Sequence, residues 1–68
     1  MGNYCVNKNA QPTGEHEVHK IGCSYLPLIE NRIPLGDCSN CQGAVKKART
    51  IYSIVDGCKY CCNACHTR

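Results

Sequence analysis

Eight cysteines in a chain of only 68 residues constrain the fold more than any other feature of this sequence. They make up about 12% of the chain, above the ~8–10% that is typical of cross-linked small domains. The chain has no Phe and no Trp, and one apolar core in a chain below roughly 70–80 residues seldom supplies more than ~3–5 kcal/mol. We therefore expect the cysteines to hold the fold together, either as disulfides or as thiolates on a metal ion.

Length and redox chemistry narrow the class of protein further. We expect one domain over residues 1–68, and no stretch approaches the ~18 apolar residues of a membrane span. The first 20 residues carry Asn, Lys, Gln, Glu and His throughout, without the apolar segment of a signal peptide. Thiols stay reduced in the cytoplasm, where clustered cysteines are more often metal ligands than disulfides. We therefore expect a cytoplasmic metal-binding protein, with a secreted disulfide-rich protein as the alternative.

The N-terminal half has the pattern of short strands. Residues 3–7 and 16–21 are β-type segments on either side of a polar loop, which predicts a hairpin. Residues 32–35 are expected to be extended, because Pro34 disfavours helix at Ile33.

The C-terminal half contains the clearest helical pattern, from about residue 40 to 55. Apolar residues recur there at helical spacing from Cys41 to Val55. Ser39 and Gln42 fit a capping box at its start, and Gly57 is a suitable stop. The fold class that we predict is α+β: a small β-hairpin, one helix and a zinc knuckle, stabilised by metal.

Two short motifs have the spacing of metal ligands. His19-x3-Cys23 lies at the end of the predicted hairpin, and Cys58-x2-Cys61 follows the predicted helix. Structural zinc takes four tetrahedral ligands and accepts thiolate and imidazole. We therefore predict one structural Zn²⁺ held by His19, Cys23, Cys58 and Cys61. Such a site can contribute an apparent ~10–16 kcal/mol to folding, which the small core lacks.

The remaining cysteines leave alternatives open. Cys38-x2-Cys41 and Cys62-x2-Cys65 could together hold a second ion, or Cys61 or Cys65 could take the place of Cys58 in an alternative frame. His66 is a further possible alternative ligand. Cys62-x2-Cys65-His66 also matches the attachment motif of c-type haem. The same surplus thiols would suit a thiol redox or metal-handling protein.

Other residues have simpler interpretations. Cys5, Cys38 and Cys41 also fit as core residues, because free cysteine packs as a small apolar group. We expect Tyr25 and Tyr52 in the core. His16 is expected to be solvated and His66 frayed.

Several spaced motifs together resemble a known bacterial pattern. They are Asn7-Lys8-Asn9, His19-x3-Cys23, Glu30-Asn31-Arg32, Ala44 in the helix, and Cys58-x2-Cys61. In this order, over about residues 4–61, they are similar to small zinc-binding modules of some bacterial nuclease-like and competence-related proteins. The resemblance implies zinc ligands at His19, Cys23, Cys58 and Cys61.

More remotely, the chain resembles the amino-terminal zinc domain of the Ada DNA-repair methyltransferase. That domain has Cys-x3-Cys where this chain has His19-x3-Cys23, and the first of its thiolates accepts the methyl group. Imidazole is a poorer acceptor than an activated thiolate, so we do not expect methyl transfer here.

Nothing else in the sequence indicates an enzyme. No paired carboxylates have catalytic spacing, no glycine loop for phosphate is present, and no small-molecule substrate is indicated. The formal net charge of +3 is a mild basic bias. On the predicted helix, Lys46, Lys47 and Arg49 are candidate nucleic-acid contacts. The sequence therefore predicts a zinc-binding module for interaction with nucleic acid or a protein partner.

Overall fold

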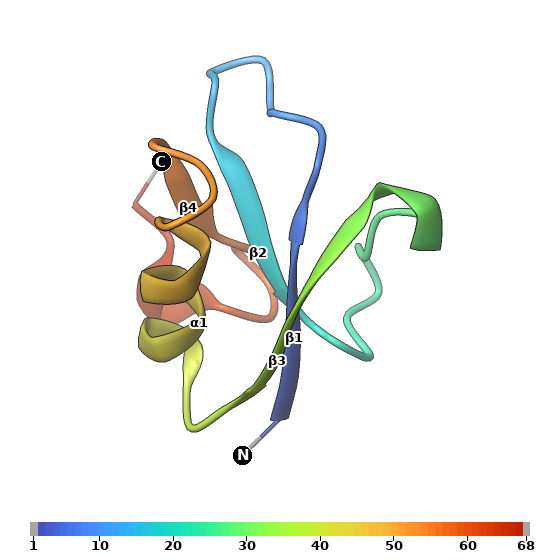
Figure 1. Ribbon diagram of the computed structural model, residues 1–68, viewed down its shortest axis with the longest axis vertical. Coiled ribbons are helices and arrows are strands. Elements are labelled where there is room, and N and C mark those ends of the chain that lie inside the picture. Colours follow the sequence, from blue (N-terminus) through green and yellow to red (C-terminus); the bar gives the residue numbers. More distant parts are fainter. Residues whose placement is uncertain (1, 68) are drawn as a thin grey trace.

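A computed structural model describes residues 2–67 and confirms the α+β class: a four-stranded mixed sheet with one helix (Figure 1). The strand order is β3-β1-β2-β4. β1 pairs antiparallel with β2 and β3, whereas β2 and β4 are parallel. The bounds are Gly2–Asn7 for β1, His16–Lys20 for β2, Arg32–Cys38 for β3 and Val55–Gly57 for β4, with α1 at Cys41–Ala48 and short 3-10 turns η1 at Ile29–Asn31 and η2 at Asn63–Cys65.

The predicted hairpin is present, and its two faces have different surroundings. Val6 lies opposite Val18, and Cys5 lies opposite His19. Successive side chains of a strand point to opposite faces of the sheet. Val6 and Val18 join the apolar core on the face that packs against α1, and both are fully buried. The other face of β2 therefore carries His19.

Helix α1 is much shorter than the predicted helix over residues 40–55. Asn40, not Ser39, is its N-cap, and the Asn40 Oδ1 accepts a hydrogen bond from the Gly43 N–H at 2.9 Å. The helix ends at Ala48 because the next segment is rich in β-branched residues, which lose side-chain freedom in a helix. No helix among residues 2–67 is long and apolar enough to cross a membrane.

Strand β4 is the element that the sequence did not predict. Its three residues pair with His16, Glu17 and Val18 of β2. The sequence of so short a segment does not reveal this pairing with a distant strand. Gly57, expected to stop the helix, lies in this strand instead. A Cβ at Gly57 would lie 2.7 Å from both the Cys62 carbonyl oxygen and the Cys65 Cβ. Glycine therefore allows the C-terminal turn to approach the strand.

Edge strand β3 accommodates two residues that would weaken a central strand. Pro34 cannot donate a ladder hydrogen bond, and β3 has a neighbour on one side only. The register with β1 shifts between Tyr4 and Cys5, beside Gly36 with φ of +80°. Such a bulge commonly uses glycine, which adopts this conformation without strain.

Candidate metal centre

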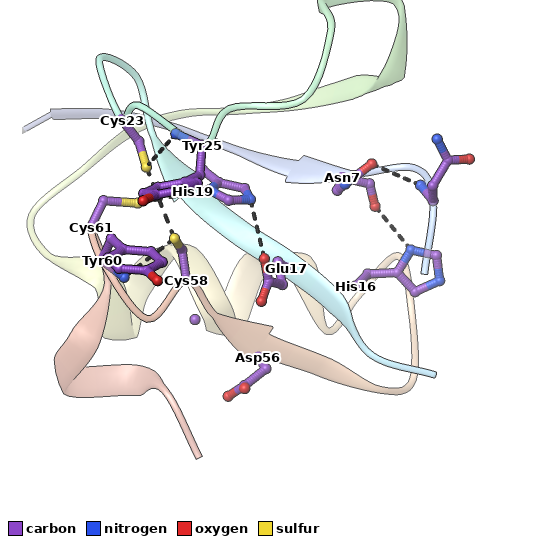
Figure 2. A network of polar contacts seen from close by, with 12 residues as sticks. Asn7, His16, Glu17, His19, Cys23, Tyr25, Asp56, Cys58, Tyr60 and Cys61 are labelled. Carbon is purple, nitrogen blue, oxygen red and sulfur yellow. Dashed lines mark hydrogen bonds and ion pairs between the residues drawn. The ribbon is translucent and has the colours of Figure 1, made fainter. Parts of the chain in front are cut away.

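The four side chains predicted as ligands meet at one end of the β2–β4 pair. The donor atoms of His19, Cys23, Cys58 and Cys61 all lie within 4.8 Å of one another. His19 belongs to β2 and Cys23 follows that strand, whereas Cys58 and Cys61 follow β4 (Figure 2). Because β2 and β4 are parallel, both strands deliver their following turns to the same edge. Within residues 2–67 this is the one group of three or more such residues with metal-binding geometry.

The spacing of these atoms fits a tetrahedral cation. The Cys23 and Cys58 sulfurs are 3.9 Å apart, and the Cys61 sulfur lies 3.8 Å from His19 Nδ1. Zn–S bonds of ~2.3 Å and Zn–N bonds of ~2.0–2.1 Å at tetrahedral angles place two sulfurs ~3.8 Å apart and sulfur and nitrogen ~3.6 Å apart. The residues present therefore suit a zinc-sized ion with soft ligands.

Backbone N–H groups point at three of the sulfurs. The Tyr25 N–H donates to Cys23 Sγ and the Tyr60 N–H donates to Cys58 Sγ, both at 3.4 Å. Each donor is two residues after its cysteine, so the turns at Cys23 and Cys58 share one local geometry. The Lys20 N–H reaches Cys61 Sγ at 3.3 Å. A hydrogen bond to the charged form of a group favours that form, here the Cys61 thiolate.

Burial sets the protonation of two proposed ligands when no ion is bound. Burial raises the pKa of the Cys61 thiol, and the Lys20 N–H opposes this. A divalent cation reverses that balance, because a coordinating thiol is deprotonated outright. Burial also lowers the pKa of His19, and the positive charge of Arg32 lowers it further. His19 is therefore neutral at neutral pH, the form that binds a metal.

A carboxylate on the same face of β2 orients His19. Glu17 and His19 are two residues apart, and Glu17 Oε1 lies 3.5 Å from His19 Nε2 (Figure 2). The other ring nitrogen, Nδ1, faces Cys61. Burial raises the pKa of Glu17, and the charges of Asp56 and Glu15 raise it further. A carboxylate that holds the outer nitrogen of a ligating histidine fixes the ring and its tautomer.

The surplus cysteines do not assemble a second tetrad. All eight cysteines carry free thiols. Cys38 is buried, and its thiol faces the carbonyl oxygens of Leu35 and Gly36 at 4.0 and 3.8 Å. Cys62 is only 1% exposed and lies in the core. The adjacent Cys61 instead belongs to the metal group, as we call the set of four candidate ligands His19, Cys23, Cys58 and Cys61. Among the five possible alternative ligands, Cys41 and Cys65 are in contact, with sulfurs 2.6 Å apart.

The C-terminal segment is held by a buried carboxylate that the sequence reading missed. Asp56 in β4 is 1% exposed, and its Oδ1 accepts hydrogen bonds from the Thr67 N–H at 2.8 Å and the Thr67 hydroxyl at 3.0 Å. His66 Nδ1 lies 3.2 Å from the other carboxylate oxygen and 3.0 Å from the Gly57 carbonyl oxygen. His66 is therefore held in place, and the expectation of a frayed residue is wrong.

These positions also do not suit haem attachment. Thioether bonds require two reachable thiols, and Cys62 is enclosed in the core. His66 is engaged with β4 rather than turned outward beside Cys65. In this fold Cys62 packs in the core and His66 contacts β4.

Two expectations about aromatic residues are wrong. Tyr25 is 57% exposed instead of buried, and it stacks on Tyr60 with ring centroids 4.1 Å apart beside the metal group (Figure 2). His16 is half-buried instead of solvated, because it stacks on Tyr52 at 3.6 Å. Both stacks join residues far apart in the sequence, which local patterns do not reveal.

The candidate nucleic-acid contacts all lie exposed on or just after α1. Lys46, Lys47 and Arg49 are solvent-accessible. Lys47 Nζ donates to the Leu35 carbonyl oxygen at 3.1 Å, so this cation also joins the helix to β3.

Comparisons with protein-family models, curated proteins and solved structures found no match to this chain. The resemblance to small bacterial zinc-binding modules therefore rests on the sequence motifs. The structure supports the part of it that concerns the His/Cys tetrad.

Proposed function

We propose that this chain is a structural zinc-binding module that interacts with a macromolecular partner. One observation carries the proposal: three cysteines and one histidine, from two distant turns, converge with the spacing of a tetrahedral ion. Zinc is favoured over harder cations because all four donors are sulfur or imidazole nitrogen. Thiolate ligands remain available in a reducing compartment, so we place the module in the cytoplasm.

The proposed ion is structural rather than catalytic. A catalytic zinc keeps one coordination position open for water or substrate. Here four side chains fill a tetrahedral shell, and the ion joins the turn after β2 to the turn after β4. The role that follows is to hold these turns together and not to perform chemistry.

The surface beside the metal group supports the interaction role. Tyr25 and Tyr60 expose 57% and 63% of their surface, and Lys59, next to Tyr60 in the sequence, is exposed. Aromatic faces and cations are the groups that contact bases and phosphates in single-stranded nucleic acid. Nucleic acid is therefore the partner class that we favour, and a protein is the alternative.

Native mass spectrometry of the chain purified under reducing conditions tests the metal. We expect one zinc ion per chain, and far-UV circular dichroism should show loss of the fold after a strong chelator removes it. A metal-free chain whose ordered fold survives the chelator would contradict the proposal.

Titration of fluorescent single-stranded and duplex oligonucleotides at several salt concentrations tests the partner. We expect binding at low salt that weakens as salt rises, because phosphate contacts release counterions. Tyr60→Ala should weaken it, whereas Lys8→Gln, a distant charge control, should have a smaller effect. Absence of binding at low salt would remove nucleic acid and leave a protein partner.

A further inference from the structure

Cys41 and Cys65 form a sulfur pair that the metal group does not use. Cys41 opens α1 and Cys65 ends η2, which packs against that helix (Figure 1). Their sulfurs are 2.6 Å apart. Two ligands of one tetrahedral zinc would be ~3.8 Å apart, and non-bonded heavy atoms pack at roughly 3.5–4.0 Å. A disulfide bond is ~2.05 Å long. The distance therefore favours a bond between the sulfurs over a shared ion.

The two sulfurs differ in access to solvent. Cys41 is buried, whereas Cys65 is partly exposed. Cys65 lines a surface hollow of about 240 Å³, and the other lining residues are Gln42, Val45, Arg49, Ala64 and Thr67. Arg49 is the charged member of this lining, and a guanidinium binds carboxylates through paired hydrogen bonds. The hollow therefore suits a small ligand that carries a carboxylate.

The segment that carries Cys65 is fixed before any reaction. Thr67 donates two hydrogen bonds to Asp56 in β4, and the Cys65 N–H donates to the Cys62 carbonyl oxygen at 2.9 Å. Gly57 permits the close approach of Cys65 to β4. The sulfur pair is therefore preorganised, and little ordering remains to be done when a bond forms.

We propose that Cys41 and Cys65 are a thiol–disulfide pair that reacts with small carboxylate-bearing disulfides of the glutathione type. The Cys65 thiolate attacks one sulfur of the small disulfide, forms a mixed disulfide and releases one small thiol. The Cys41 thiolate then attacks the Cys65 sulfur and releases the second small thiol. The chain is oxidised by two electrons, the small disulfide is reduced by two electrons, and the two protons pass to the two released thiols. The inference rests on this pair and its hollow, independently of the metal.

Oxidised glutathione is the probe for the bond itself. The full chain, purified with its metal, is incubated with this disulfide, and its intact mass should fall by about 2 Da for one disulfide. Alkylation of the remaining thiols followed by peptide mapping should place the bond between Cys41 and Cys65. No mass loss, or a bond that involves Cys23, Cys58 or Cys61, would overturn the proposal.

Cysteine variants test the order of the two steps. Cys41→Ser should stop at the mixed disulfide, with one glutathione attached to Cys65. Cys65→Ser should not form the intramolecular bond, and Cys38→Ser, a matched buried control, should react like the unaltered chain. An adduct of Cys41→Ser at another cysteine would overturn the assignment of Cys65 as the entry thiol. Mapping of the unaltered chain keeps the test valid if a variant fails to fold.

Charge variants test the hollow. Arg49→Gln should slow the reaction with oxidised glutathione about 2- to 5-fold, the range of an exposed ion pair. The same variant should slow the reaction with cystamine, a small disulfide with no carboxylate, less than the reaction with oxidised glutathione. Lys46→Gln changes charge on the same helix outside the hollow and should change neither rate. Equal slowing with both disulfides, or no slowing with either, would contradict the role of Arg49.

Discussion

The sulfurs around His19 and the two sulfurs beside α1 lie in one small domain but have different surroundings. Around His19, neighbouring donor atoms are 3.8–3.9 Å apart and three sulfurs accept backbone N–H groups. Beside α1, the sulfurs of Cys41 and Cys65 are 2.6 Å apart. Burial and the adjacent Cys41 thiol raise the pKa of Cys65 to about 12, so its exchange with small disulfides should be slow at neutral pH and should become faster as the pH rises. The first arrangement leaves room for an ion between the donor atoms, and the second leaves no such room.

Separation and hydrogen bonding, rather than residue type, therefore decide what each cysteine can do. Adjacent residues Cys61 and Cys62 show this most clearly, because one joins the metal group and the other is buried in the core.

Removal of a proposed ligand should have the largest effect. His19→Ala should abolish zinc binding and ordered structure, because a structural zinc site can contribute an apparent ~10–16 kcal/mol to folding. Native mass spectrometry and circular dichroism give the result. His16→Ala, a histidine of the same strand outside the metal group, should retain zinc. Equal zinc content in the two variants would contradict the ligand assignment.

A fall in pH should have the second largest effect, because it should weaken the proposed zinc site and leave the Cys41–Cys65 disulfide intact. Zinc binding releases protons from three thiols, so affinity should fall by up to about 1,000-fold per pH unit below pH ~8. The lowered pKa of His19 also makes the free energy of unfolding depend on pH. Its stabilising contribution is present above about pH 6.5 and is lost as the pH falls, because the imidazole of the unfolded chain takes up a proton at a higher pH than His19 in the fold.

Competition with a chromophoric chelator across pH measures this loss. Once formed, the Cys41–Cys65 disulfide should persist over the same range, since it carries no titrating proton. A zinc affinity that does not change with pH would contradict thiolate ligation.

Oxidation should stabilise the domain by a smaller amount. Cys41 and Cys65 are 24 positions apart, and a disulfide that closes a loop of this length contributes about 3–4 kcal/mol. Both Cys58 and Cys61 lie within that loop. Denaturant unfolding of the oxidised and reduced forms, at saturating zinc, measures the difference. Cys65→Ser should show no difference in stability between oxidising and reducing conditions. An oxidised form of the unaltered chain that is less stable than the reduced form would contradict the prediction.

Gly57 connects the two regions, since it precedes Cys58 and contacts the turn of Cys65. Gly57→Ala should destabilise the domain by up to about 3 kcal/mol, because the new Cβ would lie 2.7 Å from the Cys62 carbonyl oxygen and the Cys65 Cβ. Thermal unfolding measures the loss. Gly43→Ala in α1 is the control, since its Cβ meets nothing closer than 3.6 Å. A Gly57→Ala domain as stable as the control would show that the turn can move away.

The smallest predicted effect concerns the carboxylate behind His19. Glu17→Gln should weaken zinc binding about 10- to 100-fold, the usual range for such a partner. The fold at saturating zinc and the oxidation of Cys41 and Cys65 should not change. Glu30→Gln, an exposed carboxylate in η1, is the matched control, and a chelator competition measures both. An unchanged affinity in Glu17→Gln would show that the 3.5 Å contact does not orient the ring.

The metal group could be predicted from the sequence because each pair of candidate ligands lies within one short segment of the chain. His19-x3-Cys23 and Cys58-x2-Cys61 are each short enough for two donors to face one ion. The α+β class was also predictable, because strand and helix periodicities differ. The extent of the helix was not, since the apolar stripe continues to Val55 although that residue pairs with β2.

Contacts between distant segments could not be predicted. Eight cysteines allow 105 pairings, so no spacing identifies Cys41 and Cys65 as partners. The stack of Tyr25 on Tyr60 requires both metal-site turns to be in place. The burial of Asp56 depends on β4, a strand too short to show a periodic pattern.

The parallel pairing of β2 with β4 also determines when the metal site can form. Cys23 and Cys58 are separated by 35 positions, and such contacts must overcome the entropy of closing a long loop before they add stability. The pair His19 and Cys23 and the pair Cys58 and Cys61 each offer an ion only two donors until β4 has paired with β2. Capture of an ion by all four proposed ligands should therefore come late in folding, and refolding should be slower than the formation of the β1–β2 hairpin.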